Sequence, residues 1–409
     1  MTDATSPIHI PPAPSRPGHR PHWENLELPA AGVVPRPEVM VAPSEIRDLA
    51  FSMIRVLDED HQAVGPWDPH LDPETLRLGL HHMLLTRTFD ERMQLMHRQG
   101  KMSFYMQCTG EEAVAVAQGM ALEYDDMLFP SYRQQGLMIV RGKPLFELMC
   151  QCLSNSMDSL KGRQLPILYS WKEGNFFTLS GNLATQFSQA VGWAMAAQYK
   201  HTPHIAATWI GDGSTAEADF HHGLTFASVY QAPVLLNIVN NQWAISTPQS
   251  VAGGEHATFA ARGLGYAIPS LRVDGNDFLA VHAVTRWAVE RARQGGGPTL
   301  IELYTYRVAA HSTSDDPRAY RAKDEAKTWP LGDPLERLKS HLIKLGEWSE
   351  EQHTELQTAL KQEVIAAWKE AESYGTLADD PGIPATSLFD DVFKELLPHL
   401  RRQREQLQR

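Results

Sequence analysis

One segment near the middle of the chain constrains the fold more than any other, because it contains two buried-strand patterns separated by one helical pattern. Ile205–Ile210 is short and apolar and ends at Gly211-Asp212-Gly213. A helical pattern covers about Glu217–Tyr230, and a second apolar run, Pro233–Val239, ends at Asn240-Asn241. This order predicts a βαβ unit, whose two strands lie parallel in one sheet.

Polar side chains follow both of these predicted strands. Ligands of open α/β sheets bind outside the carboxyl ends of the strands, so we expect Asp212 and Asn241 to lie close together. Carboxylate, amide and main-chain carbonyl oxygens are ligands that Mg²⁺ accepts, usually together with phosphate and water. The glycines beside Asp212 and the following helix N-terminus suit an approaching phosphate. Gly-Asp-Gly alone is also typical of an ordinary strand-to-helix turn, and the Asn-Asn pair favours the metal site.

Composition narrows the class of protein. The chain has 409 residues, a net charge of −12 and a pI near 5.8, so its surface would repel nucleic acid. Mean hydropathy is −0.33, and no apolar run approaches the length of a membrane-spanning helix. The three cysteines form no Cys-x-x-Cys pair, which favours a reducing compartment. With neither a signal peptide nor a presequence pattern, we expect a soluble, cytoplasmic, bacterial protein without a membrane or nucleic-acid partner.

The chain divides into three predicted regions. Residues 1–45 are rich in proline and have no helical or strand periodicity, which predicts an extended arm. The pattern leaves open whether this arm is disordered or wraps around a partner subunit. Residues 46–330 form one large α/β domain, and residues 331–409 are predicted to be mostly helical and strongly charged. The predicted fold class is therefore α/β, with a mostly parallel, doubly wound sheet.

Further elements follow from local patterns. Asp72-Pro73-Glu74 is typical of a helix start and Gly100 of its end. Glu111 and Glu112 open a helix of small residues, and we interpret them as charges that favour its N-terminus. The other predicted elements are a polar loop at 154–172, a helix ending near Tyr199, strands at 270–273 and 299–304, a helix at 276–294, helical structure at 333–372 and a last helix at 390–409.

Four segments together resemble a known family. The Gly-Asp-Gly to Asn-Asn spacing resembles the thiamine diphosphate fingerprint. SFYM with GEE, SYRQQG, the stretch from GDG to NNQWAIST, and YRVAAHSTSDDPRAYR resemble the alpha subunits of branched-chain 2-oxo acid dehydrogenases. The resemblance runs from about Phe51 to Arg404 and implies the thiamine diphosphate-binding fold.

The resemblance also implies roles for individual residues. Asp212, Asn241 and the main-chain carbonyl of Trp243 match the Mg²⁺ ligands of the family. His311 matches a histidine near the thiazolium and the substrate carboxylate, which makes it the implied catalytic residue. The implied cofactor-binding residues are Tyr132 and Arg133 on the diphosphate, Gly181 and Leu183 on the aminopyrimidine side, and Gly211, Gly213 and Ser214 beside Asp212. Phe104 and Ser131 are assigned to the substrate pocket.

Some family members also hold a potassium ion at residues matching Ser180, Asn182, Thr185 and Gln186. This chain departs from the family pattern at Gly181 and Asn182, which makes that ion doubtful.

The implied reaction is attack of the cofactor ylid on a branched-chain 2-oxo acid, loss of CO₂, and transfer of the acyl group to the lipoyl group of a partner acyltransferase. Only one α/β domain of the required kind is visible, so we expect a beta subunit to supply the missing carboxylate in an α₂β₂ assembly. The alternatives are a pyruvate dehydrogenase alpha subunit and a non-catalytic binding subunit. We further expect the loop around His311 to become ordered only with bound cofactor, because it has no apolar anchor before Tyr320.

Overall fold

The computed structural model describes residues 8–21, 23, 26, 28–379 and 383–408. The remaining parts of the predicted arm and of the C-terminal region lie outside the described residues. Six strands form one sheet in the order β1-β7-β8-β4-β3-β2, and every neighbouring pair is parallel. The strands are β1 Met53–Ile54, β2 Met127–Phe129, β3 Ala206–Gly211, β4 Val234–Asn240, β7 Ser270–Asp274 and β8 Thr299–Tyr304. The predicted parallel α/β sheet is confirmed.

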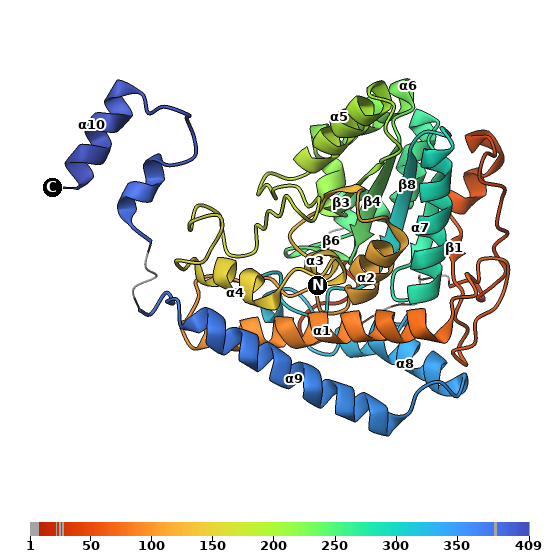
Figure 1. The fold of residues 1–409 in the computed structure, drawn as a ribbon. Coiled ribbons are helices and arrows are strands. Elements are labelled where there is room, and N and C mark those ends of the chain that lie inside the picture. Colours follow the sequence, from red (N-terminus) through yellow and green to blue (C-terminus); the bar gives the residue numbers. More distant parts are fainter. Residues whose placement is uncertain (1–7, 22, 24–25, 27, 380–382, 409) are drawn as a thin grey trace.

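Helices cover both faces of this sheet (Figure 1). Side chains alternate along β3, so that Ala207 and Trp209 join one apolar core while Ala206 and Ile210 join another. The first core includes residues of α1 Pro73–Arg98, α2 Glu112–Ala121, α3 Gln135–Val140, α4 Leu145–Leu153 and α7 Phe278–Arg293. The second includes residues of α5 Thr185–Tyr199 and α6 Ala218–Tyr230. The sheet is doubly wound, as predicted.

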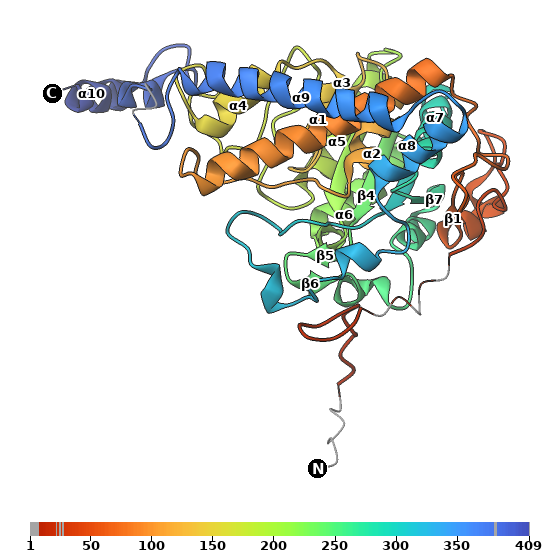
Figure 2. The ribbon, with the colours of Figure 1, turned by 90° about the horizontal axis from the view of Figure 1, so that it is seen from below.

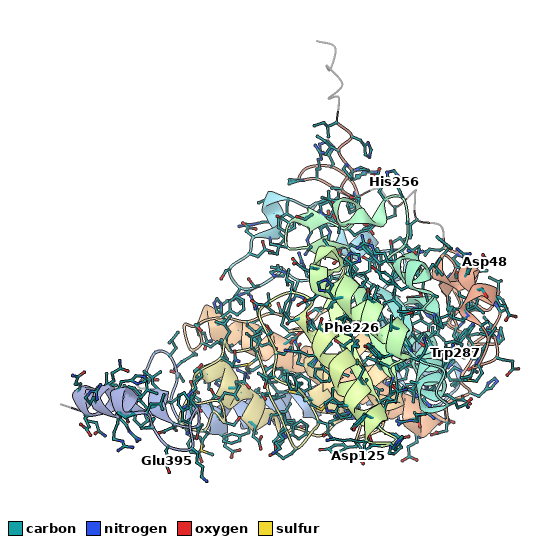
Figure 3. All side chains as sticks on the ribbon, turned by 90° about the horizontal axis from the view of Figure 1, so that it is seen from above. Asp48, Asp125, Phe226, His256, Trp287 and Glu395 are labelled. Carbon is teal, nitrogen blue, oxygen red and sulfur yellow. The ribbon has the colours of Figure 1, made fainter. Side chains whose placement is uncertain are left out.

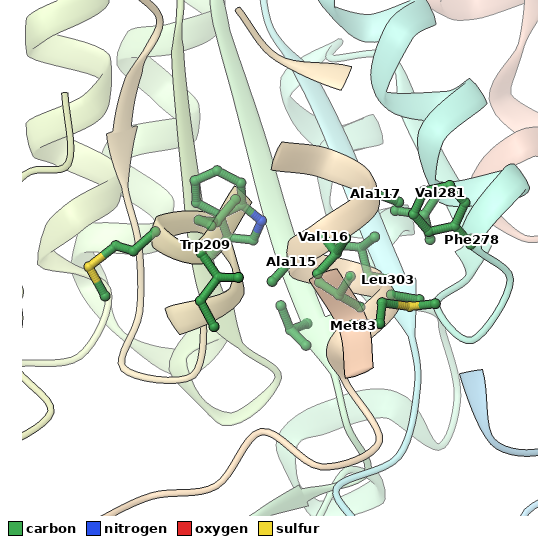
Figure 4. Packing of buried hydrophobic residues seen from close by; sticks show 14 of the residues in the cluster. Met83, Ala115, Val116, Ala117, Trp209, Phe278, Val281 and Leu303 are labelled. Carbon is green, nitrogen blue, oxygen red and sulfur yellow. The ribbon is translucent and has the colours of Figure 1, made fainter. Parts of the chain in front are cut away.

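The small-residue helix α2 lies deep in the first core. Figure 4 shows its Ala115 and Val116 with Trp209 of β3 on one side and Phe278 of α7 on the other. Alanine side chains allow neighbouring helices to approach closely, so α2 fits between the sheet and the outer helix α1. This packing holds the N-terminus of α2 at the edge of the sheet where β3 and β4 end.

The register of the strands aligns the carboxyl ends of β3, β4 and β8 at that edge. Gly211 at the end of β3 pairs with Val239 of β4, and Asn240 pairs with Tyr304 at the end of β8. The residues that follow these three strands therefore leave the sheet side by side. The predicted common edge for Asp212 and Asn241 is confirmed. Just beyond β4, the short strands β5 Trp243–Ala244 and β6 Thr247–Pro248 form an antiparallel pair.

Most predicted helices have the expected bounds. Asp72 caps α1 by accepting a hydrogen bond from the Thr75 backbone N–H, and Gly100 follows the helix with φ of +75°. The predicted helical stretch after residue 333 is two helices, α8 Pro334–Lys344 and α9 Glu350–Glu372. None of the described helices is both long and apolar enough to cross a bilayer.

The prediction of one helix over residues 390–409 was wrong. Helix α10 covers only Pro398–Leu407, and Figure 1 shows it standing away from the sheet and its covering helices. Leu397, immediately before the proline, has extended backbone angles of −62° and 148°. Proline disfavours helical angles in the preceding residue, so the charged pattern upstream cannot continue the helix through this point.

The described part of the arm is extended. The described residues between 8 and 42 contain neither helix nor strand, and a short 3₁₀ helix, Pro43–Glu45, ends the region. Figure 2 shows the arm running beside β5 and β6. The Ser250 hydroxyl donates to the Pro12 carbonyl oxygen at 2.6 Å, so the arm contacts the body of its own chain.

A buried ion-pair network fastens α8 to the sheet. Arg337 donates through Nη1 to Asp274 Oδ2 at 2.7 Å, and its Nη2 lies 3.4 Å from Asp277 Oδ2. Asp277 also accepts hydrogen bonds from the backbone N–H groups of Val56 and Leu57, and it caps α7 through Ala280 N. Removing the guanidinium would leave two buried carboxylates without this partner, which is costly.

We predict that Arg337→Ala lowers the free energy of unfolding by about 3–5 kcal/mol. Denaturant titration of the purified chain would measure the loss. Arg77→Ala is the matched control, because Arg77 forms an exposed ion pair with Glu347 on the surface of α1 and should change stability by less than about 1 kcal/mol. Equal losses in the two variants would contradict the prediction.

Candidate functional site

Four polar residues that follow different strands lie at the carboxyl edge of the sheet. Arg133 comes after β2, Asp212 after β3, Asn241 after β4 and His311 after β8. Glu111, just before α2, connects two of them, because its Oε1 lies 2.7 Å from Asn241 Nδ2 and 3.9 Å from Arg133 Nε. The edge therefore gathers residues that are far apart in the sequence.

One carboxylate oxygen of Asp212 is buried without a hydrogen-bond partner among the described residues. Its side chain is buried, and in the described part of the chain Oδ2 has no hydrogen-bond partner. Burial raises the pKa of this carboxyl to about 6, while the backbone N–H of Gly213 and the charge of Arg307 act in the opposite direction. A buried carboxylate oxygen without a partner is costly, and a bound cation would remove that cost. This oxygen fits the predicted Mg²⁺ ligand.

Asn241 is held in one orientation by Glu111. Because its Nδ2 donates to the carboxylate, its Oδ1 faces the other way and accepts only a long hydrogen bond of 3.3 Å from Trp243 N. An amide oxygen turned away from an anchored amide nitrogen is suited to binding a metal ion. Asn241 therefore also fits the predicted site.

Our interpretation of Glu111 as a charge that favours the start of α2 was wrong. Its side chain makes no capping hydrogen bond to α2 and instead faces Asn241 and Arg133. Burial raises the pKa of Glu111 to about 7, and Arg133 and Asn241 oppose that shift. Glu112 does bond back to the Gly110 N–H, and it pairs with Arg87 at 2.7 Å. Two Glu residues at a helix start are usually explained by the helix alone, so no sequence pattern marked Glu111 as part of the site.

The third predicted metal ligand has a competing partner. The Trp243 carbonyl oxygen accepts a hydrogen bond from Arg307 Nη1 at 2.8 Å. A carbonyl oxygen has a second lone pair, so this bond leaves room for a metal ion. Two cations on one oxygen repel each other, however, and an anion such as a diphosphate would be needed to offset that repulsion. The donor set fits Mg²⁺ together with a diphosphate better than Mg²⁺ alone.

Arg133 and Arg307 converge on His311. Arg133 Nη2 lies 3.1 Å and Arg307 Nη1 lies 3.3 Å from His311 Nδ1. Both guanidinium groups can only donate, so Nδ1 must accept, and the imidazole proton lies on Nε2. Burial, with the charges of Arg133 and Arg307, lowers the pKa of His311 to about 3. The ring is therefore neutral at ordinary pH and presents one N–H donor.

Tyr132 completes this side of the network. Its ring meets the His311 ring edge-on with centroids 5.9 Å apart, and the Arg133 guanidinium lies 5.4 Å from the Tyr132 ring centroid. Arg133 Nη1 also donates to the Gln107 carbonyl oxygen at 2.5 Å. Two guanidinium groups around a neutral histidine make this position favourable for an anion.

The glycines beside Asp212 have different surroundings. A side chain at Gly211 would meet no atom within 4 Å, so the space there is open to a ligand. A side chain at Gly213 would collide with Ala244 of β5, so glycine is needed for that close approach. Ser214 is buried in the short 3₁₀ helix Gly213–Ala216 that follows.

The remaining predicted residues lie around this network. Gly181 and Leu183 precede α5 and are exposed, and nearby Gln186 donates to the Trp209 carbonyl near the end of β3. Ser131 precedes Tyr132, and Phe104 precedes Tyr105, which exchanges two hydrogen bonds with Thr313. The described contacts do not join these four residues to Asp212 or Asn241, and their roles stay predictions.

The loop after Arg307 is held mainly by polar contacts. Asp315 Oδ2 accepts from the His311 N–H at 2.7 Å and from the Tyr320 hydroxyl at 2.6 Å. Arg321 donates to the carbonyl oxygens of Arg307, Val308 and Ala309. Whether the loop needs cofactor to become ordered stays a prediction.

Comparison with known proteins places the chain among related sequences. Residues 80–379 match the family model described as "Dehydrogenase E1 component". The chain is 59% identical over 400 residues to the 2-oxoisovalerate dehydrogenase subunit alpha of Pseudomonas aeruginosa, covering 98% of each chain. It is 41% identical to the mitochondrial 2-oxoisovalerate dehydrogenase subunit alpha of Mus musculus, covering 87% of this chain and 79% of the mouse protein. The corresponding subunit alpha 1 of Arabidopsis thaliana is 38% identical over 90% of this chain and 77% of its own length.

The contact between Glu111 and Asn241 generates a prediction about metal binding. Glu111→Ala should weaken Mg²⁺-dependent binding of thiamine diphosphate by about 10- to 100-fold, because Asn241 loses the acceptor that orients its amide. Glu111→Gln keeps an oxygen acceptor and should lose less. Calorimetry at several Mg²⁺ concentrations would measure both variants, and equal affinities in the wild type and Glu111→Ala would contradict the proposed role.

Proposed function

The chain belongs to the dehydrogenase E1 component family, and we propose that it is the alpha subunit of a thiamine diphosphate-dependent branched-chain 2-oxo acid dehydrogenase. The strongest support is the 59% identity over 98% of both chains with a protein named 2-oxoisovalerate dehydrogenase subunit alpha. The buried network at the sheet edge gives this assignment a chemical basis, because it offers a free carboxylate oxygen, an oriented amide oxygen and two cationic groups.

Thiamine diphosphate is implied by the family, and Mg²⁺ is part of our proposal. Asp212, Asn241 and the Trp243 carbonyl would hold the ion, and Tyr132 and Arg133 would face the diphosphate. Gly211, Gly213 and Ser214 would lie beside the phosphates, and Gly181 and Leu183 beside the aminopyrimidine. When bound, the cofactor supplies the nucleophilic carbon and the electron sink for decarboxylation of a 2-oxo acid.

His311 is the residue that we propose for the substrate end of the site. Its neutral ring offers the Nε2–H as a donor, because Arg133 and Arg307 occupy the Nδ1 side. That donor can bond the substrate carboxylate or the acyl group that is transferred. The cationic pair beside it favours an anionic substrate, and burial strengthens that attraction. We place Phe104 and Ser131 in the pocket for the branched side chain.

A beta subunit and a lipoyl-bearing acyltransferase are the partners that the family implies, and we propose an α₂β₂ heterotetramer. One face of the chain is suited to the beta subunit. Helix α5 contains no Asp, Glu, Lys or Arg, and α6 contains only Asp219. Exposed large apolar residues lie on or beside these helices, and Figure 3 shows Phe226 on the surface of α6; they are Tyr199 (85% exposed), Phe226 (51%), Val229 (69%) and Tyr230 (51%).

This charge-depleted face continues toward the proposed cofactor site, because Leu183, two residues before α5, is 46% exposed. Depletion of charge and enrichment of aromatic residues are features of protein interfaces. A beta subunit that covered α5 and α6 would therefore also close the open side of the site.

Assay of the complex co-expressed with its beta partner tests the function. We expect the complex to release CO₂ from 2-oxoisovalerate and to acylate a lipoyl domain, with pyruvate turned over more slowly. The purified chain alone should remain below about 1 turnover per second. Preference for pyruvate would favour the pyruvate dehydrogenase alternative, and a complex as inactive as its Asp212→Ala variant would favour a non-catalytic binding subunit.

The exposed face on α6 predicts a variant that fails to assemble. Phe226→Asp should weaken association with the beta subunit by on the order of 10-fold or more, because it places a charge in an apolar contact. Leu345→Asp is the matched control, since Leu345 is 50% exposed at the end of α8. Analytical ultracentrifugation would compare the two, and intact assembly of Phe226→Asp would exclude this docking face.

His311→Ala should leave assembly and cofactor affinity nearly unchanged and slow acyl transfer to the lipoyl partner by on the order of 10²-fold or more. The reason is that the Nε2–H donor acts on the reacting complex rather than on the fold. Steady-state kinetics with a lipoyl domain would measure the loss. Ser314→Ala, on the exposed part of the same loop, serves as the control, and full activity of His311→Ala would refute the role.

A further inference from the structure

We propose that the N-terminal arm is part of the active-site support, with Ser15 as a positioning residue that acts through Glu325 on Trp243 and Tyr306. The inference rests on the proposed function in one respect, since it takes the Trp243 carbonyl as part of the metal site. It assigns a role to a segment whose sequence predicted only an extended arm.

Glu325 is the centre of this arrangement. Its carboxylate is fully buried and accepts three hydrogen bonds from uncharged donors. The Trp243 indole Nε1 lies 2.6 Å and the Tyr306 hydroxyl 2.9 Å from Oε1, and the Ser15 hydroxyl donates to Oε2. Among the described residues, no Lys or Arg side chain forms an ion pair with it. A buried charge stabilised only by neutral donors depends on every one of them.

Ser15 is fixed from two sides. It is 2% exposed, and besides donating to Glu325 its Oγ accepts from the Ala322 backbone N–H at 2.9 Å. One hydroxyl therefore connects the arm to both the carboxylate and the backbone just after the His311 loop. Alanine could replace neither bond, whereas threonine has a hydroxyl that could make both.

Other arm residues hold Ser15 in place. The Pro12 carbonyl oxygen accepts from Ser250 Oγ, and Trp23 Nε1 donates to Thr328 Oγ1 at 3.0 Å. The Trp23 ring meets the Trp329 ring edge-on with centroids 5.0 Å apart. Arm residues Ala13, Trp23, Leu26 and Leu28 pack against the apolar cluster that contains Trp243, Tyr306 and Trp329. Figure 2 shows the arm on this side of the molecule, beside β5 and β6.

Glu325 connects the docked arm by hydrogen bonds to two residues next to the site, Trp243 and Tyr306. Its bond to the indole fixes the ring of Trp243, whose carbonyl oxygen faces Arg307 on the other side. Its bond to Tyr306 fixes the residue immediately before Arg307, and Arg307 in turn donates to His311 Nδ1. Losing Ser15 would therefore loosen both the proposed metal ligand and the guanidinium that orients His311.

The test uses the co-expressed alpha–beta complex with Ser15→Ala, Ser15→Thr and Ser44→Ala, the last replacing an exposed serine at the end of the arm. Calorimetry would give the Mg²⁺ concentration needed for half-maximal thiamine diphosphate binding. We expect Ser15→Ala to raise that concentration about 10-fold and Ser15→Thr to restore most of the affinity. Ser44→Ala should match the wild type.

A second variant removes the charge from Glu325 and leaves the arm intact. Glu325→Gln keeps one oxygen acceptor for Trp243 and Tyr306 but replaces the charge-assisted bond to Ser15 with a weaker bond between neutral groups, so it should shift the Mg²⁺ requirement in the same direction. Unchanged Mg²⁺ requirements in Ser15→Ala and Glu325→Gln would overturn the proposal. A loss of affinity that threonine does not rescue would also overturn it. Failure of the wild-type complex to bind thiamine diphosphate would instead refute the proposed function.

Discussion

The parallel pairing of β3 with β4 is the constraint on which the rest of the structure depends. Each strand is buried on both faces, so its register is fixed by two cores at once, and Gly211 can pair only with Val239. A slip of one residue would exchange the side chains of the two cores and would separate Asp212 from Asn241. The position of the oxygens that we propose as metal ligands is thus set by apolar packing far below them, around Trp209 and Leu235.

Electrostatic balance at the sheet edge follows from that geometry. Asp212 and Glu111 contribute buried carboxylates, and Arg133 and Arg307 contribute guanidinium groups that face a neutral histidine. The pKa of each carboxyl is raised by burial, which shows that the surrounding cations do not fully offset the loss of water. A divalent cation with an attached anion would complete the balance, since the cation would face the carboxylates and the anion the guanidinium groups.

Sequence patterns predicted the fold to the extent that local periodicity and turns encode it. The strands at 270 and 299, the capped helix α1 and the common edge of Asp212 and Asn241 all follow from patterns of a few residues. Strand β1 has only two residues, too few for a periodic signal. Glu111 and Glu325 were missed for a different reason, because their importance lies in partners more than 80 positions away, such as Asn241 and Trp243. No local pattern marks such a pairing, and the described docking of the arm was beyond prediction for the same reason.

The docking of the arm also has a consequence for how the protein is made. Ser15 leaves the ribosome well before its partners Ala322 and Glu325, which lie some 310 positions later in the chain. The arm therefore cannot form these hydrogen bonds until residues 322–325 have been synthesised and have folded onto the sheet. The prolines restrict the conformations of the arm before it docks, so ordering the arm costs less conformational entropy than ordering a glycine-rich segment would. Completion of the proposed site is then a late event of biogenesis, because a segment that is synthesised early docks only after the residues that hold it have been made.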